Sequence, residues 1–232
     1  MLICFNQWYG GIAGQSGVTT KDLSSLWSQL GAKYAGKSNI VFGIMNEPHA
    51  SASNPNDFDI NAWATTVQAC VTAIRQAGAT SQIILLPGTD FTAVGGFASV
   101  SGPALSGVHN LDGGHTNLVF DVHQYLDYDF SGTHDACTRN GVDKLQELAT
   151  WLSSKGRMAL LSETGGGNTG TCQTDVCAEL DWMNYHADVY LGWVGWAAGS
   201  FATDYVLSET PKYANGQWTD TPLVISCVAG KF

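Results

Sequence analysis

Polar side chains that could carry out acid–base chemistry follow several apolar stretches of this 232-residue chain. Glu47 follows the apolar stretch 40–45, and Glu163 follows the apolar stretch 158–162. If both stretches are parallel strands of a barrel, their carboxyl ends face one cavity. Two carboxyl groups at one site suit glycosidic cleavage, because one protonates the leaving oxygen while the other attacks or activates water. A glutamate that ends a strand is often only a helix cap, so either residue alone is weak evidence.

Further candidate groups stand at the ends of other apolar stretches. His123 ends one of them, and Trp196 ends the last one. Each has a simpler interpretation, since a single histidine is more often structural and a single tryptophan more often belongs to the core. The glycines 165–167 could cradle a phosphate, but no lysine follows them as in a P-loop. Four such groups at successive or near-successive strand ends together favour one cleft.

The elements that must position these groups can be read from hydrophobic patterns. Short apolar stretches, each expected to be a strand buried on both faces, occupy 2–5, 40–45, 82–87, 117–123, 158–163 and 189–196. Amphipathic patterns between them predict helices over 20–35, 60–76, 141–154 and 174–186. Thr20 and Asp22 are the cap candidates of the first helix. Alternating strands and helices predict parallel strands joined by right-handed crossovers.

The spacing of the predicted strands indicates an incomplete barrel. One strand–helix unit takes about 37 residues, so an eight-unit barrel would need roughly 300 residues. The chain has 232 residues and shows six such units, so we expect an α/β TIM-type barrel with about six βα units, or else an open parallel sheet. No linker interrupts the pattern, which favours a single domain over 1–232.

Composition excludes several classes of function. The chain has 10 Lys+Arg against 20 Asp+Glu, a net charge of −10, which argues against nucleic acid and against an anionic membrane surface as partners. No apolar run has the length of a membrane span, and the first residues lack the basic region of a signal peptide. The 8 Trp, 8 Tyr and 9 Phe suggest stacking surfaces for sugars, although they could equally fill the core.

The six cysteines favour disulfides over a metal or redox site. Four residues separate Cys172 and Cys177, so a Cys-x-x-Cys motif is absent there. Two disulfides in the loops are the better interpretation, and they imply an oxidising compartment. Cys70 lies in a helical pattern and is expected to be a buried thiol. The six histidines are scattered without the His-Glu-x-x-His spacing, so a metal enzyme is the least favoured reading and we expect no metal.

Four segments carry a resemblance to a known family. In order along the chain, FGIMNEPH, FDVHQYLD, LLSETGGGN and VGWAAGSF resemble the strand-end motifs of glycoside hydrolase family five, in particular its fungal endoglucanases. The resemblance extends from about Gly10 to Cys227. It implies a TIM barrel, retaining hydrolysis of β-1,4-glucan, no metal and no cofactor.

The resemblance also implies roles for individual residues. Glu47 matches the acid/base, Glu163 matches the nucleophile, and Tyr125 matches the tyrosine that positions it. Other residues match positions that bind the sugar, namely Asn46 at the 2-hydroxyl, His49, His123, the platform Trp196 and the cleft residue Trp8. The loop disulfides of the family map onto Cys137–Cys172 and Cys177–Cys227.

The start of the chain departs from the family pattern. Residues 2–6 resemble the third barrel strand, which implies that the first two units and the arginine on the second strand are absent. Phe5 stands where the family has a histidine. Missing strands would leave sheet edges and apolar surface uncovered, so we expect a homodimer that buries residues 2–5 and 189–194.

The function predicted from the sequence is therefore a secreted endo-β-1,4-glucanase that acts on cellulose or a related β-glucan. Retention of configuration requires the Glu47 and Glu163 carboxyl groups to lie about 5–5.5 Å apart. One protonated and one ionised carboxyl group predict a bell-shaped pH profile with an acidic optimum. The alternative from another class is a sugar-binding pseudoenzyme, and a mannan-active relative is a third, less favoured interpretation.

Overall fold

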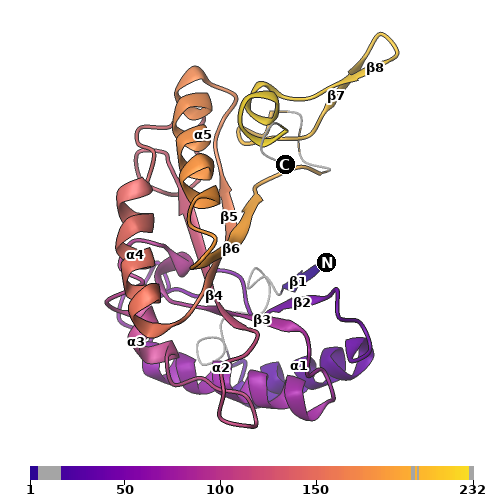
Figure 1. Cartoon of the computed structure of the whole chain (residues 1–232), viewed down its shortest axis with the longest axis vertical. Coiled ribbons are helices and arrows are strands. Elements are labelled where there is room, and N and C mark those ends of the chain that lie inside the picture. Colours follow the sequence, from indigo (N-terminus) through magenta and orange to yellow (C-terminus); the bar gives the residue numbers. More distant parts are fainter. Residues whose placement is uncertain (5–16, 200–201, 203, 230–232) are drawn as a thin grey trace. The chain divides into compact units, whose positions relative to one another are not determined.

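The computed structural model describes residues 1–4, 17–199, 202 and 204–229, and the chain forms two compact units, Met1–Val122 and His123–Phe232. The first unit contains the parallel strands β1 (Leu2–Cys4), β2 (Val41–Gly43) and β3 (Ile83–Pro87), which are hydrogen-bonded in chain order. Strand β4 (Leu118–Tyr125) pairs with β3 and continues across the boundary into the second unit. The helices α1 (Thr20–Tyr34) and α2 (Ile60–Gln76) connect these strands, as Figure 1 shows.

Each long helix of the first unit begins at a side-chain cap. Thr19 caps α1, because its hydroxyl oxygen accepts a hydrogen bond from the backbone amide of Asp22. The Asp22 carboxylate in turn accepts a hydrogen bond from the backbone amide of Thr19. The prediction of Thr20 as a cap was wrong, because Thr19 has the extended backbone that a cap requires and Thr20 is already helical. Asp59 caps α2, whose predicted bounds are confirmed.

Two buried tryptophans connect the helices of this unit to its strands. Trp27 of α1 is fully buried, and its indole N–H donates to the carbonyl oxygen of Ile44 at 3.1 Å. Trp63 of α2 donates to the carbonyl oxygen of Pro87 at 2.8 Å. Burying such rings stabilises the unit by about 2–3 kcal/mol each, and the hydrogen bonds fix each helix at the end of a strand.

The short elements η2 (Asp90–Thr92) and α3 (Ser101–Leu105) follow β3.

The second unit is built on β5 (Ala159–Gly165) and β6 (Tyr190–Gly195), which pair in parallel. The helices α4 (Val142–Lys155) and α5 (Gly170–Asn184) precede these strands along the chain. Helix α5 begins four residues earlier than predicted, because Thr169 is its cap and accepts the Cys172 amide. The cap Gly156 of α4 has a φ of 59°, which explains why the helix ends at a glycine.

Two disulfides hold the C-terminal part of the second unit. Cys137 is bonded to Cys172 at the start of α5, and Cys177 of α5 is bonded to Cys227 of η3 (Val224–Val228). The structure therefore confirms both disulfide pairs that the family resemblance implies. Figure 1 shows η3 beside α5, which agrees with the contacts between the two elements. Cys70 is buried in α2 as predicted, and burial raises the pKa of its thiol to about 12.

The structure also differs from the sequence-based expectation at β6 and in the segment that follows it. Strand β6 is not buried on both faces, since Leu191 and Val194 are 45% and 44% exposed. A hairpin of β7 (Lys212–Ala214) and β8 (Gln217–Thr219) was not predicted. Its turn, Asn215–Gly216, has positive φ at both residues and is the sequence signal that could have revealed it.

The predicted α/β alternation of parallel strands and helices is confirmed within each unit. Among the described residues, no helix is long and apolar enough to cross a membrane.

Candidate active site

The first unit positions Asn46, Glu47 and His49 directly after β2. Glu47 has a φ of 49°, a left-handed conformation that is rare for a residue with a side chain and that often marks functional loops. The His49 ring donates its Nδ1 hydrogen to the carbonyl oxygen of Glu47 at 2.6 Å. All three side chains are half-buried, so this turn holds them at the end of the strand without covering them.

A residue that the sequence analysis missed lies against this turn. The rings of Phe91 and His49 are stacked, with centroids 3.9 Å apart and an angle of 18° between planes. Asp90, Phe91 and Thr92 all have φ between 55° and 60°, so three successive residues with side chains share the left-handed conformation. Phe91 is 49% exposed. An aromatic residue just after a strand end was the signal that could have found it.

The second unit brings together three predicted site residues, from β4 and β5. The Tyr125 hydroxyl donates to Oε1 of Glu163 at 2.5 Å. His123 Nδ1 lies 3.6 Å from Oε2 of the same carboxyl group, and the His123 and Glu163 side chains are only 6% and 12% exposed. His123 and Tyr125 are two residues apart on one strand, so both point to the face on which Glu163 lies. A carboxylate held in this way by a hydroxyl donor is oriented for a reaction at its oxygens.

The opposite face of the same two strands carries polar residues that the analysis missed. Gln124 Nε2 donates to Oε1 of Glu179 at 2.6 Å, and the Thr164 hydroxyl donates to Oε2 at 2.7 Å. Glu179 lies on α5 and is fully buried, and this burial raises the pKa of its carboxyl group to about 7. A sequence signal was present, because Glu179 falls on the same helical face as Val176 and Met183.

Trp196 follows β6, and the residue remains 38% exposed. Its indole N–H donates to the Tyr205 hydroxyl oxygen at 2.5 Å, and its backbone amide donates to the carbonyl oxygen of Thr164 at 2.7 Å. Burial raises the pKa of Tyr205, the Trp196 hydrogen bond opposes this, and the charges of Glu163 and Glu209 add to the rise. Tyr205 therefore holds the Trp196 indole and feels the charge of Glu163. Sequence reasoning missed Tyr205, for which no motif gave a signal.

The glycines after Glu163 allow close packing and do not form a phosphate loop. A Cβ atom on Gly165 would collide with the carbonyl oxygen of Trp196. One on Gly166 would lie 2.8–2.9 Å from the sulfurs of Cys172 and Cys137, and one on Gly167 would collide with the backbone of Asp135. These glycines bring Trp196 and the first disulfide against the strand that carries Glu163.

The comparisons with known proteins decide the family. The family model described as "Cellulase (glycosyl hydrolase family 5)" matches residues 4–201. The chain belongs to glycosyl hydrolase family 5.

Relatives within this family are similar over nearly all of the chain. "Endoglucanase EG-II" of Hypocrea jecorina is 55% identical over 229 residues, which cover 98% of this chain and 53% of that protein. The crystal structure of Cel5A (EG2) from Hypocrea jecorina has a TM-score of 0.92 and 53% identity, and the match covers 100% of this chain and 70% of that chain. XacCel5A in complex with cellopentaose has a TM-score of 0.84 and 31% identity, covering 98% of this chain and 71% of that chain.

These matches confirm the predicted fold. The parallel strands and their helices form part of the TIM barrel of glycosyl hydrolase family 5. The chain spans about half the length of the curated relatives it matches.

The predicted site residues of this family member are divided between the two units. Asn46, Glu47 and His49 lie in the first unit, and the second unit contains the remaining described ones, His123, Tyr125, Glu163 and Trp196. Trp8 lies outside the described residues, as does Phe5. The separation of the Glu47 and Glu163 carboxyl groups and the roles assigned to all these residues stay predictions.

One loop of the second unit contains acidic residues near a histidine. Asp127, Asp129 and His134 lie close enough together to hold a metal ion. The Asp127 carboxylate, however, already accepts the amides of residues 132–134, the Ser131 hydroxyl and the His134 ring. Burial raises the pKa of Asp127, but these hydrogen bonds outweigh burial and leave the pKa below its ordinary value. The geometry fits a carboxylate that organises the loop.

Proposed function

We propose that this chain is the catalytic part of a secreted endo-β-1,4-glucanase that cleaves internal bonds of cellulose or a related β-glucan. The hydrogen bond from Tyr125 to Glu163 is the observation that carries the proposal. It orients the carboxylate as a nucleophile needs, with Oε2 of Glu163 on the side of His123. Membership of the cellulase family and the endoglucanase names of its relatives support the same activity.

The proposed reaction is a double displacement. Glu163 attacks the anomeric carbon, while Glu47 donates a proton to the glycosidic oxygen of the leaving sugar. This forms a glycosyl ester on Glu163 and leaves Glu47 ionised. Glu47 then removes a proton from water, the water oxygen attacks the same carbon, and the ester bond breaks. Two inversions retain the configuration, and both carboxyl groups return to their starting states.

The remaining site residues are proposed to bind the sugar. The exposed Trp196 ring offers a flat surface for the apolar face of a glucose unit, and Tyr205 fixes its orientation. Asn46 is assigned to the 2-hydroxyl beside Glu47. The stacked rings of His49 and Phe91 supply a second aromatic surface, in the first unit. No cofactor has a role in this reaction.

Hydrolysis of carboxymethyl cellulose by the wild type, Glu163→Gln and Glu47→Gln tests the function. The amides keep the size of the side chains but cannot attack or donate as the carboxyl groups do. We expect the wild type to release β-configured reducing ends first, as read by NMR, and each variant to lose at least about 100-fold in kcat. An inverted first product, or a Glu163→Gln variant with wild-type kcat, would contradict the mechanism.

A pseudoenzyme that binds sugar without cleaving it is the second candidate. The observation that favours it is Phe5, which stands where the family pattern has a histidine. Calorimetry with cellopentaose separates the two functions. Binding by a wild-type chain that produces no reducing ends on prolonged incubation would favour the pseudoenzyme.

We also propose an extracellular location and a homodimer. The two disulfides support secretion, because such bonds persist in oxidising compartments. The exposed apolar residues Leu191 and Val194 on β6, together with Leu2 on β1, support an interface through these strands. We propose further that residues 1–232 act as one catalytic domain.

A further inference from the structure

Glu179 is a buried carboxyl group that the proposed reaction does not use. It lies on α5 with none of its surface exposed, and neutral side chains are its hydrogen-bond donors. Burying a carboxylate is unfavourable unless its oxygens are satisfied. A leucine at this position would fill the core without that penalty, so the presence of Glu179 calls for a reason beyond packing.

The donors to Glu179 are the immediate neighbours of the proposed catalytic groups. Gln124 stands between His123 and Tyr125 on β4, and Thr164 follows Glu163 on β5. Because successive side chains of a strand point to opposite faces, Gln124 and Thr164 point away from the face that carries Tyr125 and Glu163. The Glu179 carboxyl group thus binds both strands on the face opposite the Tyr125–Glu163 hydrogen bond.

The geometry allocates one oxygen of Glu179 to each strand. Oε1 accepts from Gln124 at 2.6 Å and Oε2 accepts from Thr164 at 2.7 Å. Gln124 also donates to the carbonyl oxygen of Gly141 at 3.3 Å, so its amide is held on two sides. Losing either oxygen therefore releases one of the two side chains that Glu179 holds, directly behind the residues where Tyr125 meets Glu163.

We propose that Glu179 is a positioning residue, which holds Gln124 on β4 and Thr164 on β5 and thereby fixes the orientation in which the Tyr125 hydroxyl meets Glu163. The inference rests on the proposed function, because it assigns Glu163 the role of nucleophile. Glu179 does not touch the substrate and acts only through Gln124 and Thr164. Its removal lowers the rate of the chemical step and leaves sugar binding by the aromatic residues in place.

Three variants test this role through kcat and KM on carboxymethyl cellulose. Thr164→Val removes the hydroxyl donor at nearly constant volume, and Glu179→Leu removes both acceptor oxygens. We expect each to lower kcat about tenfold or more, with KM within about twofold of the wild type. Glu179→Gln still accepts from Gln124 and can donate to the Thr164 oxygen, so we expect it to keep kcat within about threefold of the wild type.

Thr66→Val is the matched control. Thr66 is buried on α2 in the first unit, and its hydroxyl shares a hydrogen bond with Thr20 at 2.7 Å. This variant loses a buried hydroxyl of the same kind and should keep the wild-type kcat. If Glu179→Leu does not fold, Thr164→Val decides the question. A folded Thr164→Val with kcat within twofold of the wild type, or with a loss no larger than that of Thr66→Val, overturns the proposal.

A second measurement needs no turnover and separates this proposal from the proposed function. The Tyr125 hydroxyl proton, held by a short hydrogen bond, should give a low-field NMR signal that is absent in Tyr125→Phe. We expect the signal to persist in Glu179→Gln and to shift or disappear in Thr164→Val. If the wild type hydrolyses nothing, the proposed function fails, and this signal alone decides on Glu179. An unchanged signal in Thr164→Val would overturn the positioning role.

Discussion

Single side chains of the second unit differ in how burial affects their ionisation. Burial raises the pKa of Glu179 to about 7, against an ordinary value of 4.5, and the hydrogen bonds from Gln124 and Thr164 only partly oppose this. Asp127 shows the reverse balance, because its many donors outweigh burial and lower its pKa. Hydrogen-bond donors to a carboxylate favour its charged form and burial disfavours it, so the balance of the two at each site decides the direction.

The raised pKa of Glu179 predicts a pH-dependent contribution to stability. The folded state binds a proton here more tightly than the unfolded state, so this contribution is fully present below about pH 4.5 and is lost as pH rises through about 7. Glu179→Gln removes the titrating group. We expect the variant to gain on the order of 3 kcal/mol relative to the wild type between pH 4.5 and 8.

Urea unfolding of both proteins at pH 4.5, 6 and 8 measures this difference. Taking the difference between variant and wild type cancels the contribution of groups such as Asp127, which titrate equally in both. A difference in unfolding free energy that stays constant across this range would show that Glu179 does not titrate there.

At Tyr125, the prediction concerns the rate of reaction. Tyr125→Phe removes the hydroxyl that donates to Glu163 at 2.5 Å and keeps the ring in place. A hydrogen bond to a charged group contributes about 1.5–3 kcal/mol, so we expect kcat/KM on carboxymethyl cellulose to fall roughly 10- to 150-fold. Tyr128→Phe is the matched control, since Tyr128 is 61% exposed and should tolerate the loss of its hydroxyl. Equal kcat/KM for both variants would contradict the contact.

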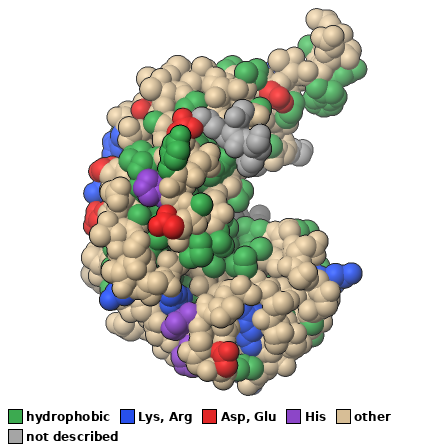
Figure 2. All heavy atoms as spheres, viewed as in Figure 1, with side chains coloured by type: hydrophobic (Ala, Val, Ile, Leu, Met, Phe, Trp, Pro, Cys, Tyr) green, Lys and Arg blue, Asp and Glu red, His purple; other side chains and the backbone are tan. Residues whose placement is uncertain are grey.

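Among the elements, α5 contacts several other described parts of the second unit, namely α4, β6 and η3. Cys172 in its first turn is bonded to Cys137, Cys177 near its middle is bonded to Cys227 of η3, and Glu179 follows shortly after. The hairpin of β7 and β8 has no such connection, and Tyr213 and Trp218 on it are 62% and 71% exposed. Figure 2 shows hydrophobic side chains at the surface of this hairpin.

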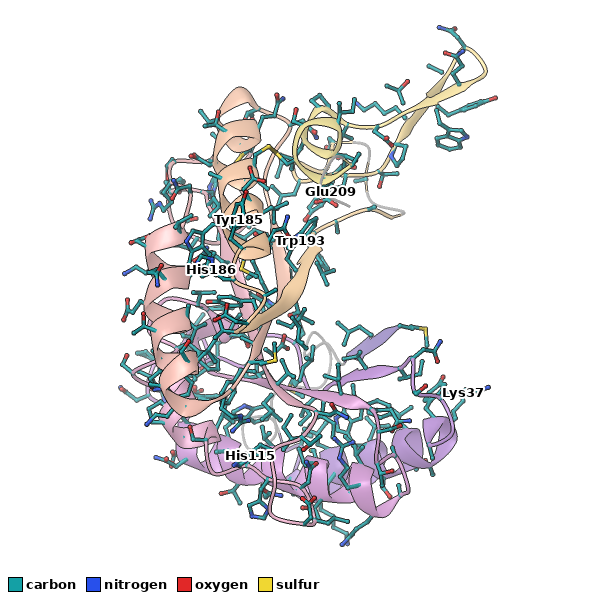
Figure 3. The ribbon with its side chains drawn as sticks, viewed as in Figure 1. Lys37, His115, Tyr185, His186, Trp193 and Glu209 are labelled. Carbon is teal, nitrogen blue, oxygen red and sulfur yellow. A yellow bond between two sulfur atoms is a disulfide. The ribbon has the colours of Figure 1, made fainter. Side chains whose placement is uncertain are left out.

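Glu209, labelled in Figure 3, lies on the segment between β6 and β7, and burial raises the pKa of its carboxyl group.

The Cys177–Cys227 disulfide predicts a measurable loss of stability when it is removed. It closes a loop with a sequence separation of 50, for which the chain-entropy model gives about 4 kcal/mol. We expect the double variant Cys177→Ser/Cys227→Ser to lose up to this amount in urea unfolding. Cys70→Ser serves as a control for thiol replacement, because Cys70 forms no disulfide. Equal stability of the double variant and the wild type would show that η3 is held by packing alone.

For the whole molecule, the prediction is the assembly state. Leu191 and Val194 expose apolar surface on β6, which pairs with β5 along one edge in the described part of the chain. Covering several hundred Å² of apolar surface contributes on the order of 10 kcal/mol, enough for a stable pair. We expect a dimer in sedimentation at micromolar concentration, and Leu191→Lys/Val194→Lys should shift it to monomer. A wild type that sediments as a monomer would contradict the homodimer.

How far the sequence predicts this protein depends on the range of the interactions involved. Continuous apolar stretches, and a glycine shortly after α2 and α4, are local signals, so all six parallel strands and the bounds of α2 could be read from the sequence. Glu163, Tyr125 and Trp196 could be indicated as site residues because each lies in a short motif, which is also a local signal. The burial of β6 could not be read, because exposure depends on what packs against a strand rather than on its own residues.

The sequence by itself determined the types of elements and the polar residues at strand ends, because hydrophobic periodicity and backbone conformational preferences act over a few neighbouring residues. Only the tertiary structure decided that Glu179 meets Gln124 and Thr164, and that Tyr205 accepts the indole hydrogen of Trp196. These partners are far apart in the chain or follow no motif. Their contacts arise when α5 and the segment after β6 pack against the strands, which depends on the close approaches that glycines such as Gly165 allow.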